Sequence, residues 1–129
     1  LLILAILFST LSYSQLTDAN FQTAINTCLA TNPEDGMCSD SEYGAMPDWD
    51  VSNVTDMSFM FNRTSNFNQD IGGWDVSNVT DMNQMFRLAD DFNQDLTLWC
   101  VYNFSSMPSN FSSNSALTAS NHPVWGTCP

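Results

Sequence analysis

Trp49, Trp74 and Trp99 are evenly spaced and open the segments 49–73, 74–98 and 99–111. The first two segments begin with the same nine letters, WDVSNVTDM, and are identical at 15 of 25 positions. The third, which starts WCVYNFSSMPSNF, is a degenerate copy. Repeats of this length are typical of proteins in which each unit buries its apolar face against the next. This repeat constrains the fold more than any other feature of the chain.

The apolar positions of each unit predict a short strand followed by a short helix. In the second unit, Trp74 and Val76 flank an outward Asp75, as in a strand. Further along, apolar residues follow the spacing of one helical face, with Thr80 and Asp81 suited to its first turn. We therefore expect an α/β repeat solenoid resembling leucine-rich repeats. Its interior columns would be Met57, Met82 and Met107, and Phe61, Phe86 and Phe111.

Two and a half units need covers at both open ends. Segment 15–48 is predicted to be an N-terminal cap, with a helix over about 18–30 that Thr17 and Asp18 begin. Segment 112–129 is predicted to be the C-terminal cap. Between the returning loops, Asn68 and Asn93 are expected to form an amide ladder that satisfies backbone groups.

The four cysteines allow three pairings. We favour Cys28 with Cys38, which closes a small loop in the first cap. We also favour Cys100 with Cys128, because positions one unit apart in stacked strands lie about 5 Å apart. A zinc site is the alternative, but the chain has no CxxC pair and a single histidine.

Residues 1–14, LLILAILFSTLSYS, are predicted to be a truncated signal peptide. The apolar run is too short to span a bilayer, and Ser12-Tyr13-Ser14 resembles a cleavage site. We expect the mature chain to begin at Gln15, to be secreted or held at the cell surface, and not to insert into the membrane. Export also provides the oxidising environment in which disulfides persist.

The charge balance excludes some partners. The chain has 14 acidic and 2 basic residues, for a formal net charge of -12. Nucleic acids and anionic membrane surfaces are excluded, because binding them requires clustered Lys and Arg. Calcium remains a possible partner, because three pairs of acids recur at the repeat period and carboxylates are calcium ligands. The pairs are Asp50 and Asp75, Asp56 and Asp81, and Asp70 and Asp95.

No catalytic constellation is visible, and we expect neither an enzyme nor a cofactor. His122 is the single histidine, and no nucleophile or orienting group can be assigned to it. Five Asn-x-Ser/Thr sequons are interpreted as turn residues rather than glycan acceptors, because three of them share one repeat position. They are Asn53, Asn62, Asn78, Asn103 and Asn110.

The outward strand positions are the candidate binding surface, because they can vary while the core stays fixed. They are Asp50, Ser52, Asp75, Ser77 and Tyr102. We expect a binding or adhesion module for an extracellular protein or polysaccharide. The alternatives are a passive spacer or coat segment of a larger surface protein and, less favoured, a calcium-binding surface module.

The motif WDVSNVTDM, followed by MF and FNQD, resembles the surface-protein repeat of the BspA-like family, also known as a Mycoplasma-type domain of unknown function. The segments before and after the repeats resemble secreted members from marine Bacteroidetes. The resemblance implies a leucine-rich-repeat-like solenoid that is secreted or held at the cell surface and is associated with adhesion. It implies no catalytic residues.

Overall fold

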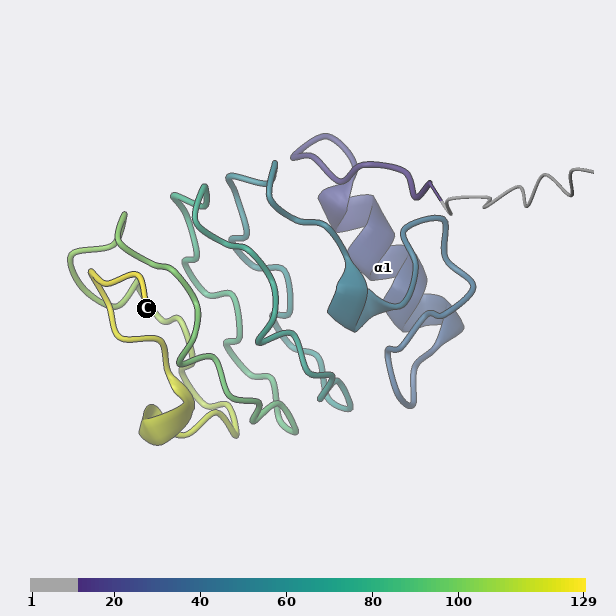
Figure 1. The fold of residues 1–129 in the computed structure, drawn as a ribbon. Coiled ribbons are helices and arrows are strands. Elements are labelled where there is room, and N and C mark those ends of the chain that lie inside the picture. The colour runs from purple at the N-terminus through teal and green to yellow at the C-terminus, as the bar shows by residue number, and fades with distance from the viewer. Residues whose placement is uncertain (1–11) are drawn as a thin grey trace, which may run out of the picture.

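The computed structural model describes residues 12–129, which form turn-rich units lying side by side between two caps (Figure 1). The described part contains one α-helix, α1 (Phe21–Thr31), and two single-turn 3-10 helices, η1 (Met46–Asp48) and η2 (Ala119–Asn121). Its only β-bridge is isolated and joins Asp56 to Asp81 in parallel. Most of the expected signal peptide, residues 1–14, lies outside the described residues.

The expected α/β leucine-rich-repeat-like solenoid is wrong. The described units contain neither a strand nor an α-helix, so Thr80 and Asp81 begin no helix. Where the helix was expected, positive φ angles of 61° at Phe59 and 62° at Arg63 interrupt the right-handed conformation. Where the strand was expected, a turn from Val76 O to Val79 N (3.0 Å) ends the extended stretch after three residues.

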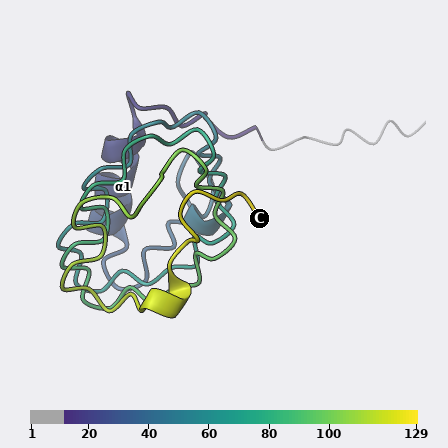
Figure 2. The same cartoon turned by 90° about the vertical axis from the view of Figure 1, so that its left-hand side faces the viewer.

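Backbone hydrogen bonds to the next unit explain why the helix does not form. From Met57 to Arg63, every second N–H donates to a carbonyl of the next unit, as in Met57 N to Asp81 O (2.8 Å) and Phe61 N to Met85 O (2.9 Å). These donors are therefore unavailable for bonds within a helix. The intervening N–H groups close tight turns within their own unit, such as Asn62 N to Phe59 O (3.1 Å). Viewed along the stack, the units follow similar outlines (Figure 2).

The interior is built from columns of equivalent apolar residues. Phe61 stacks on Phe86 with ring centroids 5.5 Å apart, and Phe67 stacks on Phe92 at the same distance. Within each unit the two phenylalanines also stack, at 4.2 Å, so the four rings form a nearly parallel block. The indole N–H of each of the three repeat tryptophans donates to a backbone carbonyl: Trp49 to Gly44, Trp74 to Met46, and Trp99 to Ile71. The alternation expected for Trp74, Asp75 and Val76 is confirmed, since only Asp75 is exposed.

The hydrogen-bond register of the third unit shifts by one residue between Phe104 and Ser109. In the first unit, Phe61 N donates to Met85 O, the carbonyl just before the equivalent residue Phe86. In the second unit, Phe86 N donates to Phe111 O. This acceptor lies 25 residues after its donor, whereas Met85 lies 24 residues after Phe61. Met107 therefore does not continue the column of Met57 and Met82; it is 50% exposed, and this part of the column prediction is wrong. Phe111 is buried, but it meets Phe86 edge-on at 85° instead of stacking on it.

The N-terminal cap consists of α1 and the loop that follows it. The helix buries Phe21 and Ile25 against the first units, and the Phe21 ring packs edge-on against Trp74 at 5.8 Å. It begins later than expected, after Asn20, and neither Thr17 nor Asp18 caps it. Asp18 instead closes the open end of the stack.

The Asp18 carboxylate takes the place of a carbonyl that a preceding unit would supply. Its Oδ1 accepts from Thr55 N (2.7 Å) and Asp56 N (3.2 Å). One unit further along, Thr55 O accepts from Thr80 N (2.8 Å) and Asp81 N (3.4 Å) in the same way. The Asp18 side chain also accepts from the Thr55 hydroxyl at 2.5 Å. These bonds hold the pKa of Asp18 below its ordinary value.

The C-terminal segment closes the other end. Residues 124–128 return beside the third unit, where Val101 N donates to Thr127 O (2.8 Å) and Cys100 is bonded to Cys128. The second disulfide joins Cys28 to Cys38. Both pairings are those that the spacing predicted. Trp125 covers Phe111, with ring centroids 5.0 Å apart.

The expected asparagine ladder is present. The Asn68 side-chain oxygen accepts from Asn93 N (2.9 Å), and the Asn93 oxygen accepts from Thr118 N (3.0 Å). The side-chain oxygens of Asn68 and Asn93 therefore satisfy the backbone N–H groups of Asn93 and Thr118 in the neighbouring loops.

Candidate functional site

The predicted binding residues lie in two rows on one side of the stack, which we call the lateral face: Asp50, Ser52, Asp75, Ser77 and Tyr102. Asp50, Asp75 and Cys100 occupy the same repeat position, as do Ser52, Ser77 and Tyr102. Both aspartates are exposed and both serines are half-buried. Tyr102 is 58% exposed, which is high for a large aromatic side chain. The first row ends at the disulfide of Cys100.

Each aspartate of the lateral face also holds a turn. Asp50 Oδ1 accepts from the backbone N–H (3.1 Å) and the hydroxyl (2.5 Å) of Ser52, and Asp75 makes the same two bonds to Ser77. The bonds from Ser52 lower the pKa of Asp50 below its ordinary value. Both bonds use one carboxylate oxygen, Oδ1, so Oδ2 takes no part in the turn.

The other periodic aspartates also accept hydrogen bonds within their own turns. Asp56 and Asp81 accept from the N–H two residues later, both at 2.9 Å. Asp70 accepts from Gly72 N (3.0 Å), and Asp95 accepts from Thr97 N (2.9 Å), a contact that lowers the pKa of Asp95 together with the Thr97 hydroxyl. Within residues 12–129, no group of three or more His, Cys, Asp or Glu side chains is arranged to hold a metal ion.

Two of the sequon asparagines join neighbouring units. The amide nitrogen of Asn78 donates to Ser52 O (2.7 Å), and that of Asn103 donates to Ser77 O (2.9 Å). These bonds join adjacent units directly beside the lateral face, and they hold successive residues of each row in register. They support the interpretation of these asparagines as turn residues.

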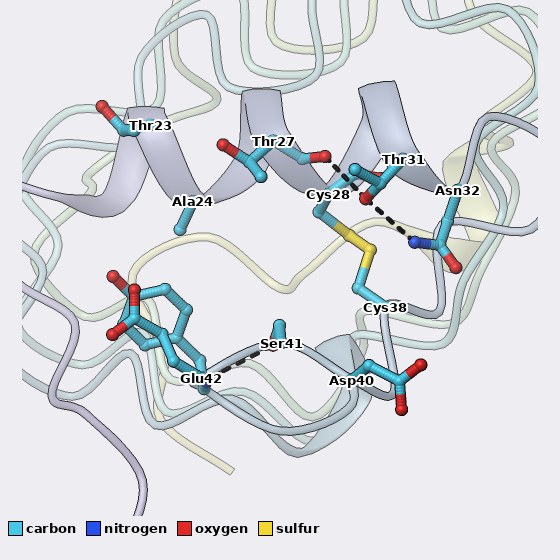
Figure 3. A pocket seen from close by; sticks show the side chains of 11 residues that line it. Thr23, Ala24, Thr27, Cys28, Thr31, Asn32, Cys38, Asp40, Ser41 and Glu42 are labelled. Atoms are coloured by element: carbon cyan, nitrogen blue, oxygen red, sulfur yellow. Dashed lines mark hydrogen bonds between the residues drawn. A yellow bond between two sulfur atoms is a disulfide. The ribbon is translucent and has the colours of Figure 1, made fainter.

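A cavity that the sequence reasoning missed lies in the N-terminal cap (Figure 3). It has a volume of about 560 Å³ and separates α1 from the loop 38–43, which we call the cap loop. Thr23, Thr27 and Thr31 line its helical side. Their regular spacing along one helical face, beside Cys28, is a sequence signal that could have revealed a polar face on a helix otherwise assigned to packing.

His122 is half-buried and lies beside Ser112 in the C-terminal cap. Its Nε2 lies 3.0 Å from the Ser112 hydroxyl, and its ring packs edge-on against Phe111 at 5.8 Å. Burial lowers the pKa of His122, and a backbone contact with Leu117 partly opposes this. The histidine lies against a core aromatic ring.

The described residues contain no helix with the length and apolar character needed to cross a membrane. No curated protein and no solved structure matches the chain. One family model matches residues 36–125, which is more than half of the sequence and includes both full repeats, the third unit and most of the C-terminal cap. The chain therefore belongs to the family described as Mycoplasma protein of unknown function, DUF285.

Proposed function

We propose that this chain is a non-catalytic binding module that acts outside the cell or at its surface, and that it contacts its ligand through the lateral face. One observation carries the proposal: cross-unit bonds hold outward side chains of successive units in register while the positions behind them are buried. The valines between the outward residues, Val51, Val76 and Val101, are each 1% exposed. The outward positions can therefore change without altering the core.

The chemistry of the lateral face favours a ligand that donates hydrogen bonds. Each turn aspartate keeps Oδ2 outside its turn bonds, and Tyr102 adds an exposed aromatic ring beside them. Hydroxyl groups of a polysaccharide, or basic side chains of an extracellular protein, fit this arrangement. The two disulfides are compatible with an extracellular location.

Binding of the purified chain to a glycan array and to immobilised extracellular proteins tests the proposal. Asp75→Asn is the informative change at the turn, because an amide oxygen still accepts from Ser77 while the charge is lost. Combined with Tyr102→Ser, it should reduce binding at least tenfold. The matched control is Asp91→Asn, which removes one charge from an exposed loop of the same unit. If binding survives the double change, the lateral face is not the ligand surface.

A passive structural role is the second candidate, and the turn bonds favour it. All six periodic aspartates accept bonds within their own turns, so the repetition of acids already has a structural explanation. A spacer or coat segment predicts no saturable binding on either array. A calcium-binding role is the third candidate. It predicts heat in a calcium titration and a melting temperature that falls on addition of a chelator.

A further inference from the structure

The cavity in the N-terminal cap has walls that are held in place. α1 forms one wall and the cap loop forms the other, and the disulfide between Cys28 and Cys38 joins them at one end (Figure 3). Both cysteines are 3% exposed, so this link is part of the core. The volume of about 560 Å³ lies within the range of sites for small molecules.

Part of the cavity lining is apolar. Ala24, which is 6% exposed, and the disulfide contribute a surface without charge. Tyr43 lines the same cavity, and its ring packs edge-on against Trp49 with centroids 5.7 Å apart and planes at 68°. Because Trp49 is buried in the first unit, the tyrosine ring has a defined position. This surface suits a compact apolar body rather than an extended polar chain.

The charged side chains around the cavity are all negative. The cap loop contributes the carboxylates of Asp40 and Glu42, and none of the lining residues is basic. The two basic residues of the whole chain, Arg63 and Arg87, belong to the repeat units. Burial and the neighbouring Glu42 charge together raise the pKa of the Tyr43 hydroxyl. An anionic ligand would therefore be repelled, and a cation would be attracted.

The helical wall supplies acceptors for an ammonium group. Thr23, Thr27 and Thr31 lie one turn apart on α1 and line the cavity beside Ala24 and Cys28, which point toward the cap loop (Figure 3). The Thr31 hydroxyl donates to Thr27 O at 2.8 Å and accepts from the Asn32 side-chain amide at 3.0 Å, so its oxygen is fixed with one lone pair left to accept a further bond. Hydroxyl oxygens accept from N–H groups, and a cation close to an aromatic ring gains a further favourable interaction.

We propose that this cavity binds a small organic cation, in which an ammonium group is attached to a compact apolar body. The body occupies the surface of Ala24, the disulfide and Tyr43, and the ammonium group faces the carboxylates of the cap loop. The lining of this cavity includes no residue of the lateral face, so its failure leaves the proposed function unaffected.

Three probes of one shape and different charge test the proposal: cyclohexylammonium, cyclohexanol and cyclohexanecarboxylate. Binding is followed through backbone amide chemical shifts of the isotope-labelled chain. The ammonium compound should bind most tightly and the carboxylate most weakly, with the largest shifts at Ala24, Thr27 and Ser41. Equal affinities for the three probes, or shifts centred outside the N-terminal cap, would overturn the proposal.

Charge and shape variants complete the test. Asp40→Asn combined with Glu42→Gln should weaken ammonium binding about three- to tenfold and leave cyclohexanol binding unchanged. The control, Asp90→Asn with Asp91→Asn, removes the same charge from an exposed loop of the second unit and should have little effect. Ala24→Leu fills the cavity and should abolish binding of all three probes. If the control pair weakens ammonium binding as much as the cap-loop pair does, the attraction comes from the net charge of the chain and the site is refuted.

Discussion

Gly72 lies against the backbone of the next unit, and replacing it tests the packing between the two units. An ideal Cβ at this position would lie 2.4 Å from the backbone oxygen of Asp95 and 3.2 Å from Asp70 Oδ1. The Asp95 backbone cannot move easily, because its side chain accepts from both the N–H (2.9 Å) and the hydroxyl (2.6 Å) of Thr97. Gly72→Ala must therefore push the two units apart locally or strain one of the turns.

The expected cost of Gly72→Ala follows from this overlap. Carbon and oxygen make ordinary contact at roughly 3.4 Å, so a displacement of about 1 Å is needed. Forcing extra atoms into a packed interface costs about 1–3 kcal/mol. For a chain of this size, that loss lowers the melting temperature by roughly 4–15 °C. Thermal and urea unfolding, followed by circular dichroism, measure the loss.

The neighbouring glycine provides a matched control. A Cβ at Gly73 would meet no atom within 4 Å, and its backbone is not in the left-handed region. Gly73→Ala should leave stability unchanged or raise it by up to about 1 kcal/mol, because alanine restricts the unfolded chain. Parental stability in both variants would refute the close contact between units. An equal loss in both would show that this turn needs glycine for its backbone and not for space.

Three further predictions concern the two caps. Asp18→Asn should lower the melting temperature at pH 7. This difference should begin to shrink as the pH falls below about 4 and should be lost as the pH falls through the lower pKa of the folded state, because a carboxylate with a depressed pKa contributes its full stability only above its unfolded pKa. Replacing both Cys100 and Cys128 by serine should cost roughly 2–4 kcal/mol in denaturant unfolding, because it opens a closed loop. His122 should titrate below 6.5 by proton NMR, and His122→Gln should remove a loss of stability that begins as the pH falls below that value.

Specific results would contradict each of these. An Asp18→Asn difference that persists at pH 2 would mean that the charge of Asp18 does not hold the Thr55 and Asp56 donors. A serine pair at positions 100 and 128 that unfolds like the parent would mean that the C-terminal segment is held by Trp125 and not by the disulfide. A His122 titration at or above 6.5 would show that the ring is hydrated and not packed on Phe111.

The sequence was sufficient to predict much of the interior and both disulfides. Trp74 and Val76 alternate with an exposed Asp75, and such a pattern marks buried positions whether or not a regular strand forms. The spacing of Val79, Met82 and Phe86 also marked buried positions correctly, but the same spacing fits consecutive tight turns. The choice between helix and turns depends on carbonyl acceptors in the neighbouring unit, and the periodicity of one unit does not report them.

Other features depended on contacts between distant segments. Nothing local to Asp18 distinguishes a helix cap from a bond to Thr55, which lies far along the chain in the first unit. The one-residue shift of the third unit appears only in the hydrogen bonds between the second and third units, because the sequence keeps the regular spacing from Phe86 to Phe111. The cavity depends on how far the cap loop stands from α1, which the pairing of Cys28 with Cys38 limits but does not determine.

The Asp18 carboxylate also bears on how such chains change in length. Because it serves as the acceptor for the first unit, the chain needs only one specialised start, whatever number of copies follows it. An additional copy of the unit inserted between Gly73 and Trp74 would meet the same donors and acceptors on both sides. A copy of the second unit inserted before Trp99 gives the same chain, because the last copy then faces the third unit as the second unit does now. The special bonds at the two ends are therefore needed only once, and the chain is expected to lengthen by duplication of its interior unit.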